Sequence, residues 1–140
     1  MKARIKWVED ACFVGETGSG HGVVIDGSPD IGGRNLGARP MELLLMGVAS
    51  CSAMDVVHIL KRARQPVRDC WADADAERAE SAPRVFTRIH LHFVVVGAGL
   101  NGAQVERAVK LSAEKYCSAS IMLRDVVEVT HDFEIRDLGR

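Results

Sequence analysis

The chain has 140 residues, of which 47% are hydrophobic, and its formal net charge is −1 at pH 7. This length matches one ordinary globular domain, so we expect residues 1–140 to form a single domain. Acidic and basic residues are interspersed and nearly balanced, which excludes the charge pattern of a protein that binds nucleic acid or anionic lipid.

Three short β-prone runs open the sequence, "ARIKWVED", "ACFVGET" and "HGVVIDG". Gly-rich turns separate them, and this pattern indicates a three-strand meander. The first ten residues are already alternating and charged rather than apolar, so we expect no export and a cytoplasmic location. Cysteines of a reducing compartment are more often free, metal-bound or redox-active than joined in structural disulfides. This applies to all four: Cys12, Cys51, Cys70 and Cys117.

A long apolar segment follows, with the sequence "LLLMGVASCSAMDVVHIL". Pro40 suits the first position of a helix, because its missing N–H would have no partner there. Glu42 lies in the first turn, where the helix dipole favours an anion. Pro66 stops the helix, which we expect at about residues 40–64.

This helix is apolar on every side from Leu43 to Met54. A membrane span needs about 20 apolar residues, and the stretch between Glu42 and Asp55 is much shorter, so we expect no membrane partner. One side of the helix can pack on the protein's own sheet, and the other needs a second subunit. Small residues surround Cys51 and would let another helix approach closely, which predicts a homodimer.

Two further strands, "VRDCWADADAE" and "RVFTRIHLHFVVV", are joined by "SAPR" and indicate a hairpin. If Glu80 faces Val85, one face pairs small with large apolar residues: Ala72 with Phe93, Ala74 with Leu91, and Ala76 with Ile89. The other face pairs Asp73 with His92, Asp75 with His90, and Glu77 with Arg88. A cross-strand charge ladder explains that polar face more simply than a metal site built from its histidines and aspartates.

The segment "NGAQVERAVKLSAEKYC" predicts a second helix, capped by Asn101. Its apolar stripe contains Val105, Ala108, Val109 and Tyr116. A short apolar turn, "SASIML", comes next, and "VEVTHDFEIR" alternates as a half-buried strand does. In chain order the elements are β-β-β-α-β-β-α-α-β, which is an α+β fold with a long buried central helix.

Two segments, "PMELLLMGVASCSAMDVVHIL" and "LSAEKYCSAS", resemble the signature segments of the OsmC/Ohr superfamily, and the whole chain is most similar to its YhfA-like branch. The resemblance implies an OsmC-like fold, an intertwined homodimer, and thiol-dependent reduction of organic hydroperoxides and peroxide. Carried over, Cys51 matches the attacking thiol, Cys117 the resolving thiol, and Glu42 the acidic residue of the site. The family's peroxidases also use an arginine from the N-terminal strand region, and "EDACFVGETGSG" contains none.

The residues themselves constrain this chemistry. Cys51 lies in mid-helix, where no terminus stabilises a thiolate, whereas Cys117 precedes a turn whose free N–H groups can do so. Glu42 lies about 180° around the helix from Cys51, so it would act from the partner chain or through an arginine that it orients. Its simpler role is to stabilise the helix dipole. Asp55 and His58 share the Cys51 stripe, and we interpret both as interface contacts.

Two functions fit these features. In a thiol peroxidase, Cys51 attacks the O–O bond, Cys117 condenses with the resulting sulfenic acid, and an external dithiol reduces the disulfide, with no cofactor or metal. The alternative is a non-catalytic redox sensor or small-ligand-binding dimer. The discriminating feature is whether another cation, Arg39 or Arg34, reaches Cys51. Cys12 and Cys70 are expected to be packing residues.

Overall fold

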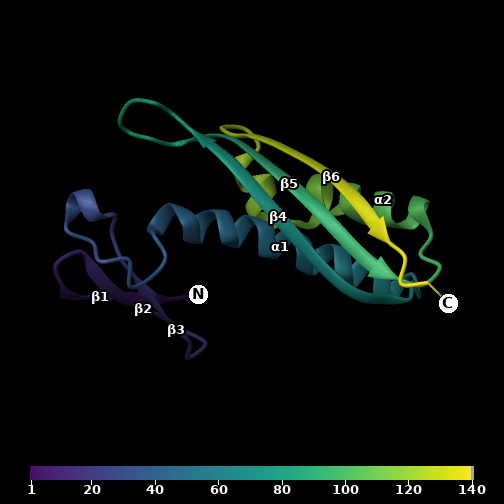
Figure 1. Ribbon diagram of the computed structural model, residues 1–140, viewed down its shortest axis with the longest axis horizontal. Coiled ribbons are helices and arrows are strands. Elements are labelled where there is room, and N and C mark those ends of the chain that lie inside the picture. Colours follow the sequence, from purple (N-terminus) through teal and green to yellow (C-terminus); the bar gives the residue numbers. More distant parts are fainter. Residues whose placement is uncertain (140) are drawn as a thin grey trace. The chain divides into compact units, whose positions relative to one another are not determined.

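The computed structural model describes residues 1–139 and divides the chain into two compact units, Met1–Leu44 and Leu45–Arg140. The first unit contains an antiparallel sheet of order β1-β2-β3, whose strands are Ala3–Glu9, Cys12–Thr17 and Gly22–Ile25 (Figure 1). The three-strand meander predicted from the Gly-rich turns is therefore confirmed. A short 3₁₀ helix, η1, follows at Pro29–Ile31.

The loop after β3 is organised by the buried side chain of Asp26. Its carboxylate accepts hydrogen bonds from the backbone N–H groups of Gly27, Arg34 and Leu36, at 2.8 to 3.1 Å. The bond from Leu36 is the strongest influence that lowers the pKa of this carboxyl group. This hydrogen-bonded aspartate thus fixes the path of the chain that leads into the following long helix.

Helix α1 spans Pro40–Arg62, two residues shorter than predicted at its C-terminal end. The difference arises because Arg64 adopts a left-handed φ of 57° and the Gln65 N–H donates to the Leu60 carbonyl, which closes the helix. Its buried residues are Val48, Ser52, Val56 and Leu60, so a single chain covers one stripe of the helix. The predicted long central helix is present, but most of its surface is open in one chain.

Helix α1 is also long and apolar enough, by length and composition, to cross a membrane. The core helix of a soluble protein passes the same test. Val56 and Leu60 on one stripe of α1 are completely buried, so this side of the helix packs on other parts of the chain.

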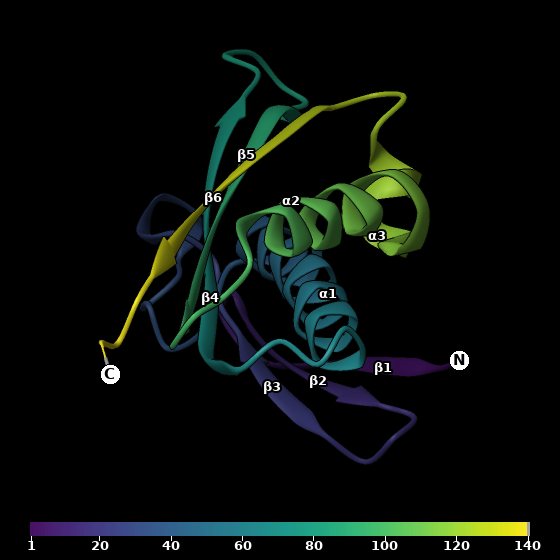
Figure 2. The ribbon, with the colours of Figure 1, turned by 90° about the vertical axis from the view of Figure 1, so that its right-hand side faces the viewer.

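The second unit contains a mixed sheet of order β4-β5-β6, made of Val67–Arg78, Phe86–Gly97 and Glu128–Arg136. Strands β4 and β5 are antiparallel, whereas β5 and β6 are parallel. Helix α2 (Gly102–Leu111), the π-helical turn η2 (Ser112–Tyr116) and α3 (Ser118–Leu123) connect β5 to β6. Figure 2 shows α1 and α2 on the same face of this sheet. The element order predicted from the sequence is confirmed as an α+β fold.

The predicted register of the β4-β5 hairpin is confirmed from Ala72 to Glu77, including Ala74 opposite Leu91 and Asp73 opposite His92. The predicted pairing of Glu80 with Val85 is wrong. A β-bulge after Glu77 pairs Arg78 with Phe86, and the Ala79 N–H then donates to the Val85 carbonyl.

The core of the second unit lies on the apolar face of the sheet. Ile89, Leu91 and Phe93 of β5 are buried, together with Val105 and Val109 of α2. The predicted cap of α2 is confirmed, since the Asn101 side chain accepts from the Gln104 N–H.

Tyr116 does not share the predicted stripe of α2 and is 49% exposed. The Cys117 N–H bonds to the Ser112 carbonyl five residues earlier, which identifies a π-helical turn. The wider turn changes the angular position of each residue that follows it, so the 3.6-residue period no longer applies to Tyr116.

The polar face of the sheet carries the two strand histidines. His92 Nδ1 lies 2.6 Å from Asp132 Oδ1, and His90 Nδ1 lies 2.7 Å from Thr130 Oγ1. The predicted cross-strand ladder with β4 is confirmed in register, with Asp73 opposite His92 and Asp75 opposite His90. Its third pair, Glu77 and Arg88, forms an ion pair at 3.8 Å. The hydrogen-bond partners of the two histidines, however, do not come from β4. The parallel strand β6 supplies them, while Asp73 accepts from the Trp71 indole instead.

The His92–Asp132 pair predicts a pH-dependent stability. The bond to Asp132 raises the pKa of His92 and lowers that of Asp132, with Glu134 and Asp73 adding to the effect on His92. The contribution of His92 to the free energy of unfolding is complete at pH values below the pKa of this histidine in the unfolded chain. It is lost as the pH rises through the higher pKa that His92 has in the folded protein. The contribution of Asp132 to the free energy of unfolding is lost as the pH falls through the lowered pKa that Asp132 has in the folded protein. The pair therefore stabilises the fold most between about pH 4 and 6.5.

Urea unfolding of wild type and Asp132→Asn at pH 5.5 and 8.5 measures this contribution. We expect Asp132→Asn to lower the free energy of unfolding by less than about 1 kcal/mol at pH 5.5, because both groups are partly solvated. The loss should be smaller still at pH 8.5. An equal loss at both pH values would contradict the assignment.

Candidate functional site

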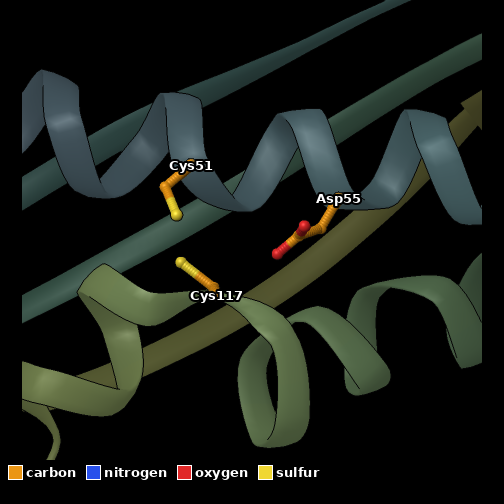
Figure 3. A group of neighbouring side chains, drawn as sticks. All are labelled: Cys51, Asp55 and Cys117. Atoms are coloured by element: carbon orange, nitrogen blue, oxygen red, sulfur yellow. The ribbon is translucent and has the colours of Figure 1, made fainter.

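Cys51 and Cys117 approach each other between α1 and the start of α3. Cys51 projects from the middle of α1, and Cys117 lies at the N-cap of α3, directly after the π-helical turn (Figure 3). Their sulfur atoms and a carboxylate oxygen of Asp55 all lie within 4.8 Å of one another. The predicted proximity of the two cysteines is confirmed, although the whole of the β4-β5 hairpin and α2 separates them in sequence.

Cys117 lies in an environment that favours its thiolate. The side chain is completely buried, and burial alone raises the pKa of a thiol. The Ser120 hydroxyl and N–H, the Ser52 hydroxyl and the Cys51 thiol all donate toward its sulfur, and together they hold the pKa of Cys117 below its ordinary value. The Ser52 Oγ lies 3.1 Å from the sulfur. The structure therefore supplies donors, rather than a cation, to this anion.

Cys51 lies in a different environment. The Ala119 N–H lowers the pKa of Cys51, but burial, the Cys117 sulfur and the negative charge of Asp55 outweigh this donor and raise it. Its side chain is half-buried, in contrast to that of Cys117. The Cys51 thiol therefore donates toward the Cys117 sulfur, and the pKa of Cys117 is shifted downward while that of Cys51 is shifted upward.

Asp55 forms a cluster with Cys51 and Cys117. Asp55 was interpreted from the sequence as a dimer-interface contact and was not placed beside Cys117. It follows Cys51 by one helical turn on the same face of α1, so both side chains point to Cys117. The Ser112 hydroxyl lies 3.4 Å from Asp55 Oδ2 and 3.2 Å from the Ser52 carbonyl. The spacing of four residues between Cys51 and Asp55 was the available sequence signal.

Sequence reasoning also missed the serines around Cys117. Ser52, Ser112 and Ser120 are all buried, and each makes at least one hydrogen bond. Serine is common in turns and at helix ends, so its type alone gives no indication of a site. Only the packing of α1 against the turn before α3 reveals their role.

Glu42 stabilises the beginning of α1. Its Oε2 accepts from the Arg39 N–H at 2.9 Å, and this bond is the main cause that lowers the pKa of Glu42. Its Oε1 also pairs with the Arg39 guanidinium at 3.2 Å. The geometry is that of the acidic half of a capping box, so Glu42 both caps α1 and orients an arginine. The other arginine considered from the sequence, Arg34, pairs with Glu9.

Cys12 and Cys70 lie outside the cluster. Cys12 is 7% exposed and begins β2, and Cys70 is half-buried on β4 opposite Val95. Burial and the neighbouring Asp69 raise the pKa of Cys70, which makes it a poor nucleophile. These surroundings fit the packing role expected for both.

Comparisons with known proteins agree with this architecture. A family model described as "OsmC-like protein" matches residues 32–132. Protein YhfA of Escherichia coli (strain K12) is 50% identical over 135 residues, which cover 96% of this chain and 98% of that protein.

Among solved structures, a hypothetical protein from Aquifex aeolicus VF5 superposes with a TM-score of 0.86 at 32% identity, covering 99% of this chain and 97% of the other. An organic hydroperoxide resistance protein from Legionella pneumophila superposes with a TM-score of 0.72 at 20% identity, covering 95% of both chains. At that identity the likeness concerns the fold alone.

Proposed function

Because this chain belongs to the OsmC-like protein family, we propose that it is a thiol-dependent peroxidase that reduces organic hydroperoxides through Cys51 and Cys117. The observation that carries the proposal is the convergence of the two sulfur atoms within 4.8 Å. The family includes proteins described by organic hydroperoxide resistance, such as the Legionella pneumophila protein. The proposed role is defence against oxidative stress in the cytoplasm, where free thiols persist.

The first step begins with a proton shared by the two sulfurs. Cys51 is the accessible member of the pair, whereas the buried Cys117 sulfur cannot meet a substrate directly. Transfer of the Cys51 proton to the Cys117 thiolate leaves a thiolate on Cys51. That thiolate attacks the terminal oxygen of the hydroperoxide, the O–O bond breaks, and Cys51 becomes a sulfenic acid while an alkoxide leaves. The alkoxide takes the proton from Cys117 and departs as an alcohol.

The second step joins the two cysteines. The Cys117 thiolate, stabilised by Ser52 and Ser120, attacks the Cys51 sulfenic sulfur and displaces hydroxide, which is protonated to water. The sulfurs must move together from within 4.8 Å to about 2.05 Å, a change that small shifts at a helix and a turn can supply. An external dithiol then reduces the disulfide and returns both thiols. Each cycle consumes one hydroperoxide and one dithiol.

We propose that the protein acts as a homodimer and that Glu42 contributes through Arg39, the cation that it orients. A second copy would supply this pair, because Glu42 and Cys51 occupy opposite faces of one helix. The alternative function, a redox sensor or small-ligand-binding dimer, is favoured by the negative charge of Asp55, which opposes formation of a thiolate on Cys51.

The rate of hydroperoxide loss separates the two functions. We expect purified protein to reduce cumene hydroperoxide catalytically with dihydrolipoamide as the dithiol, over many turnovers per chain. A sensor whose disulfide is not reduced by dihydrolipoamide would instead be oxidised once, so consumption would stop after about one equivalent per chain. That second result would overturn the peroxidase proposal.

A further inference from the structure

The cluster of Cys51, Asp55 and Cys117 contains one group for which the peroxidase cycle has no use, the carboxylate. We propose that these three side chains also form a binding site for a thiophilic divalent cation, with Zn²⁺ as the representative ion. This inference goes beyond the proposed function, because metal binding needs neither a peroxide nor a dithiol. Figure 3 shows all three side chains directed into the same space between α1 and the segment that carries Cys117.

The distances suit a tetrahedral ion. Zinc binds cysteine sulfur at about 2.3 Å and carboxylate oxygen at about 2.0 to 2.2 Å, which places tetrahedral ligands about 3.5 to 3.8 Å apart. The three ligand atoms already lie within 4.8 Å of one another, so a contraction of at most about 1.3 Å completes the arrangement. Three protein ligands leave a fourth position for water or another small ligand.

The charges also suit a cation. The site gathers one carboxylate and two sulfur ligands, a donor set suited to a thiophilic divalent cation. Within residues 1–139, Asp55 takes part in no ion pair, and its hydrogen-bond partner is the Ser112 hydroxyl. A divalent ion would neutralise the charge of the Asp55 carboxylate, which lies with both sulfurs within 4.8 Å. Binding would release a proton from Cys51.

The residues around the ligands are arranged as support for a metal site. Ser52 Oγ and the Ser120 N–H lie 3.1 and 3.4 Å from the Cys117 sulfur. The Ser112 hydroxyl fixes Asp55. Hydrogen bonds of this kind orient metal ligands and tune their basicity, and losing one typically lowers affinity about 10- to 100-fold.

Metal binding and disulfide formation would exclude each other. The disulfide removes both sulfur ligands, so oxidation would release the ion, and a bound ion would protect both thiols from hydroperoxide. The same three residues would thus couple metal occupancy to the redox state of the protein.

Cobalt titration of the full-length protein, reduced with a phosphine, tests this inference. We expect one Co²⁺ per chain, with thiolate-to-cobalt charge-transfer bands in the near ultraviolet and visible bands of tetrahedral intensity. Adding Zn²⁺ should abolish both. Cys51→Ser and Cys117→Ser should each lose at least half of the charge-transfer intensity, and Asp55→Asn should bind at least tenfold more weakly. Cys70→Ser is the matched control, because Cys70 also adjoins a carboxylate but has no second thiol, and it should behave as wild type.

Alkylation of wild-type protein provides a readout that needs no variant. Zn²⁺ should slow modification of Cys51 by N-ethylmaleimide at least tenfold while leaving Cys70 unaffected. Absence of the cobalt bands, or equal binding by wild type and Asp55→Asn, would overturn the inference. No peroxide enters these experiments, so wild-type protein that binds no cobalt can still turn over hydroperoxide. Wild-type protein without hydroperoxide turnover can likewise still show the cobalt bands.

Discussion

Cys51→Ser is expected to reduce hydroperoxide turnover to the rate measured without protein. Serine keeps the size and the hydrogen bonding of the side chain, but its hydroxyl cannot be oxidised to a sulfenic acid. Cys51 is the half-buried member of the pair, so no other sulfur of the cluster is accessible to take over its role. Turnover of cumene hydroperoxide with a dithiol measures the loss, and circular dichroism confirms that the variant is folded.

Cys117→Ser is expected to fail at a different step. Cys51 would still react once, more slowly because the sulfur that accepts its proton is absent. Its sulfenic acid would then persist because the resolving sulfur is absent as well. A dimedone adduct on the peptide that contains Cys51, found by mass spectrometry, would identify this species. Cys70→Ser serves as the matched control and should keep full turnover, since Cys70 lies on β4 outside the cluster. An adduct on Cys70, or full turnover by Cys51→Ser, would contradict the assignment of roles.

The second large effect concerns assembly, and we expect Gly47→Arg to convert a homodimer into monomers. Gly47 lies on the exposed part of α1, and a Cβ atom placed there meets nothing within 4 Å in a single chain. Glycine in an open helix interior costs roughly 1 kcal/mol relative to alanine, which suggests that the missing side chain leaves room for a neighbour. A long charged side chain would occupy that room and bury its charge without a partner.

The exposed apolar side chains of both units support this expectation. On α1, Met46 and Met54 are 60% and 71% exposed. In the first unit, β1 is exposed along its whole length, and Ile5, Phe13 and Leu44 are among the residues that line an open apolar hollow. Surfaces of this kind typically mark protein interfaces.

Sedimentation velocity at micromolar concentration measures the expected loss of assembly. Gly47→Arg should sediment as a folded or partly unfolded monomer, whereas Glu106→Arg, a charge change on the exposed side of α2, should remain a dimer. A wild-type monomer under the same conditions, or an unaffected Gly47→Arg dimer, would contradict the proposed interface.

The fold was accessible to sequence reasoning where a local pattern repeats. The alternation of apolar and polar residues along β4 and β5 determines their register. The pairs Ala72 with Phe93 and Asp75 with His90 were therefore predicted correctly. The prediction failed where one extra residue changes the period without a sequence signature, at the bulge after Glu77 and at the π-helical turn before Cys117.

The candidate site was accessible only in part. The two cysteines stand out by their chemistry and by the resemblance of their segments to a known family. The hydrogen-bond partners of Cys117 and His92 could not be identified from the sequence. Ser120 and Asp132 reach these residues only through tertiary contacts within the fold. Asp55 shows the same limit, since its spacing from Cys51 gives a shared helix face but not what that face meets.

The central claim is that Cys51 and Cys117 form one redox pair, and peptide mapping after stoichiometric oxidation tests it most directly. Reduced protein treated with one equivalent of cumene hydroperoxide per chain should lose two thiols, and the digest should contain the Cys51 peptide joined to the Cys117 peptide. The remaining thiols, on Cys12 and Cys70, should still react with iodoacetamide after unfolding. A digest in which Cys51 and Cys117 stay reduced, or in which either is joined to Cys12 or Cys70 instead, would contradict the account.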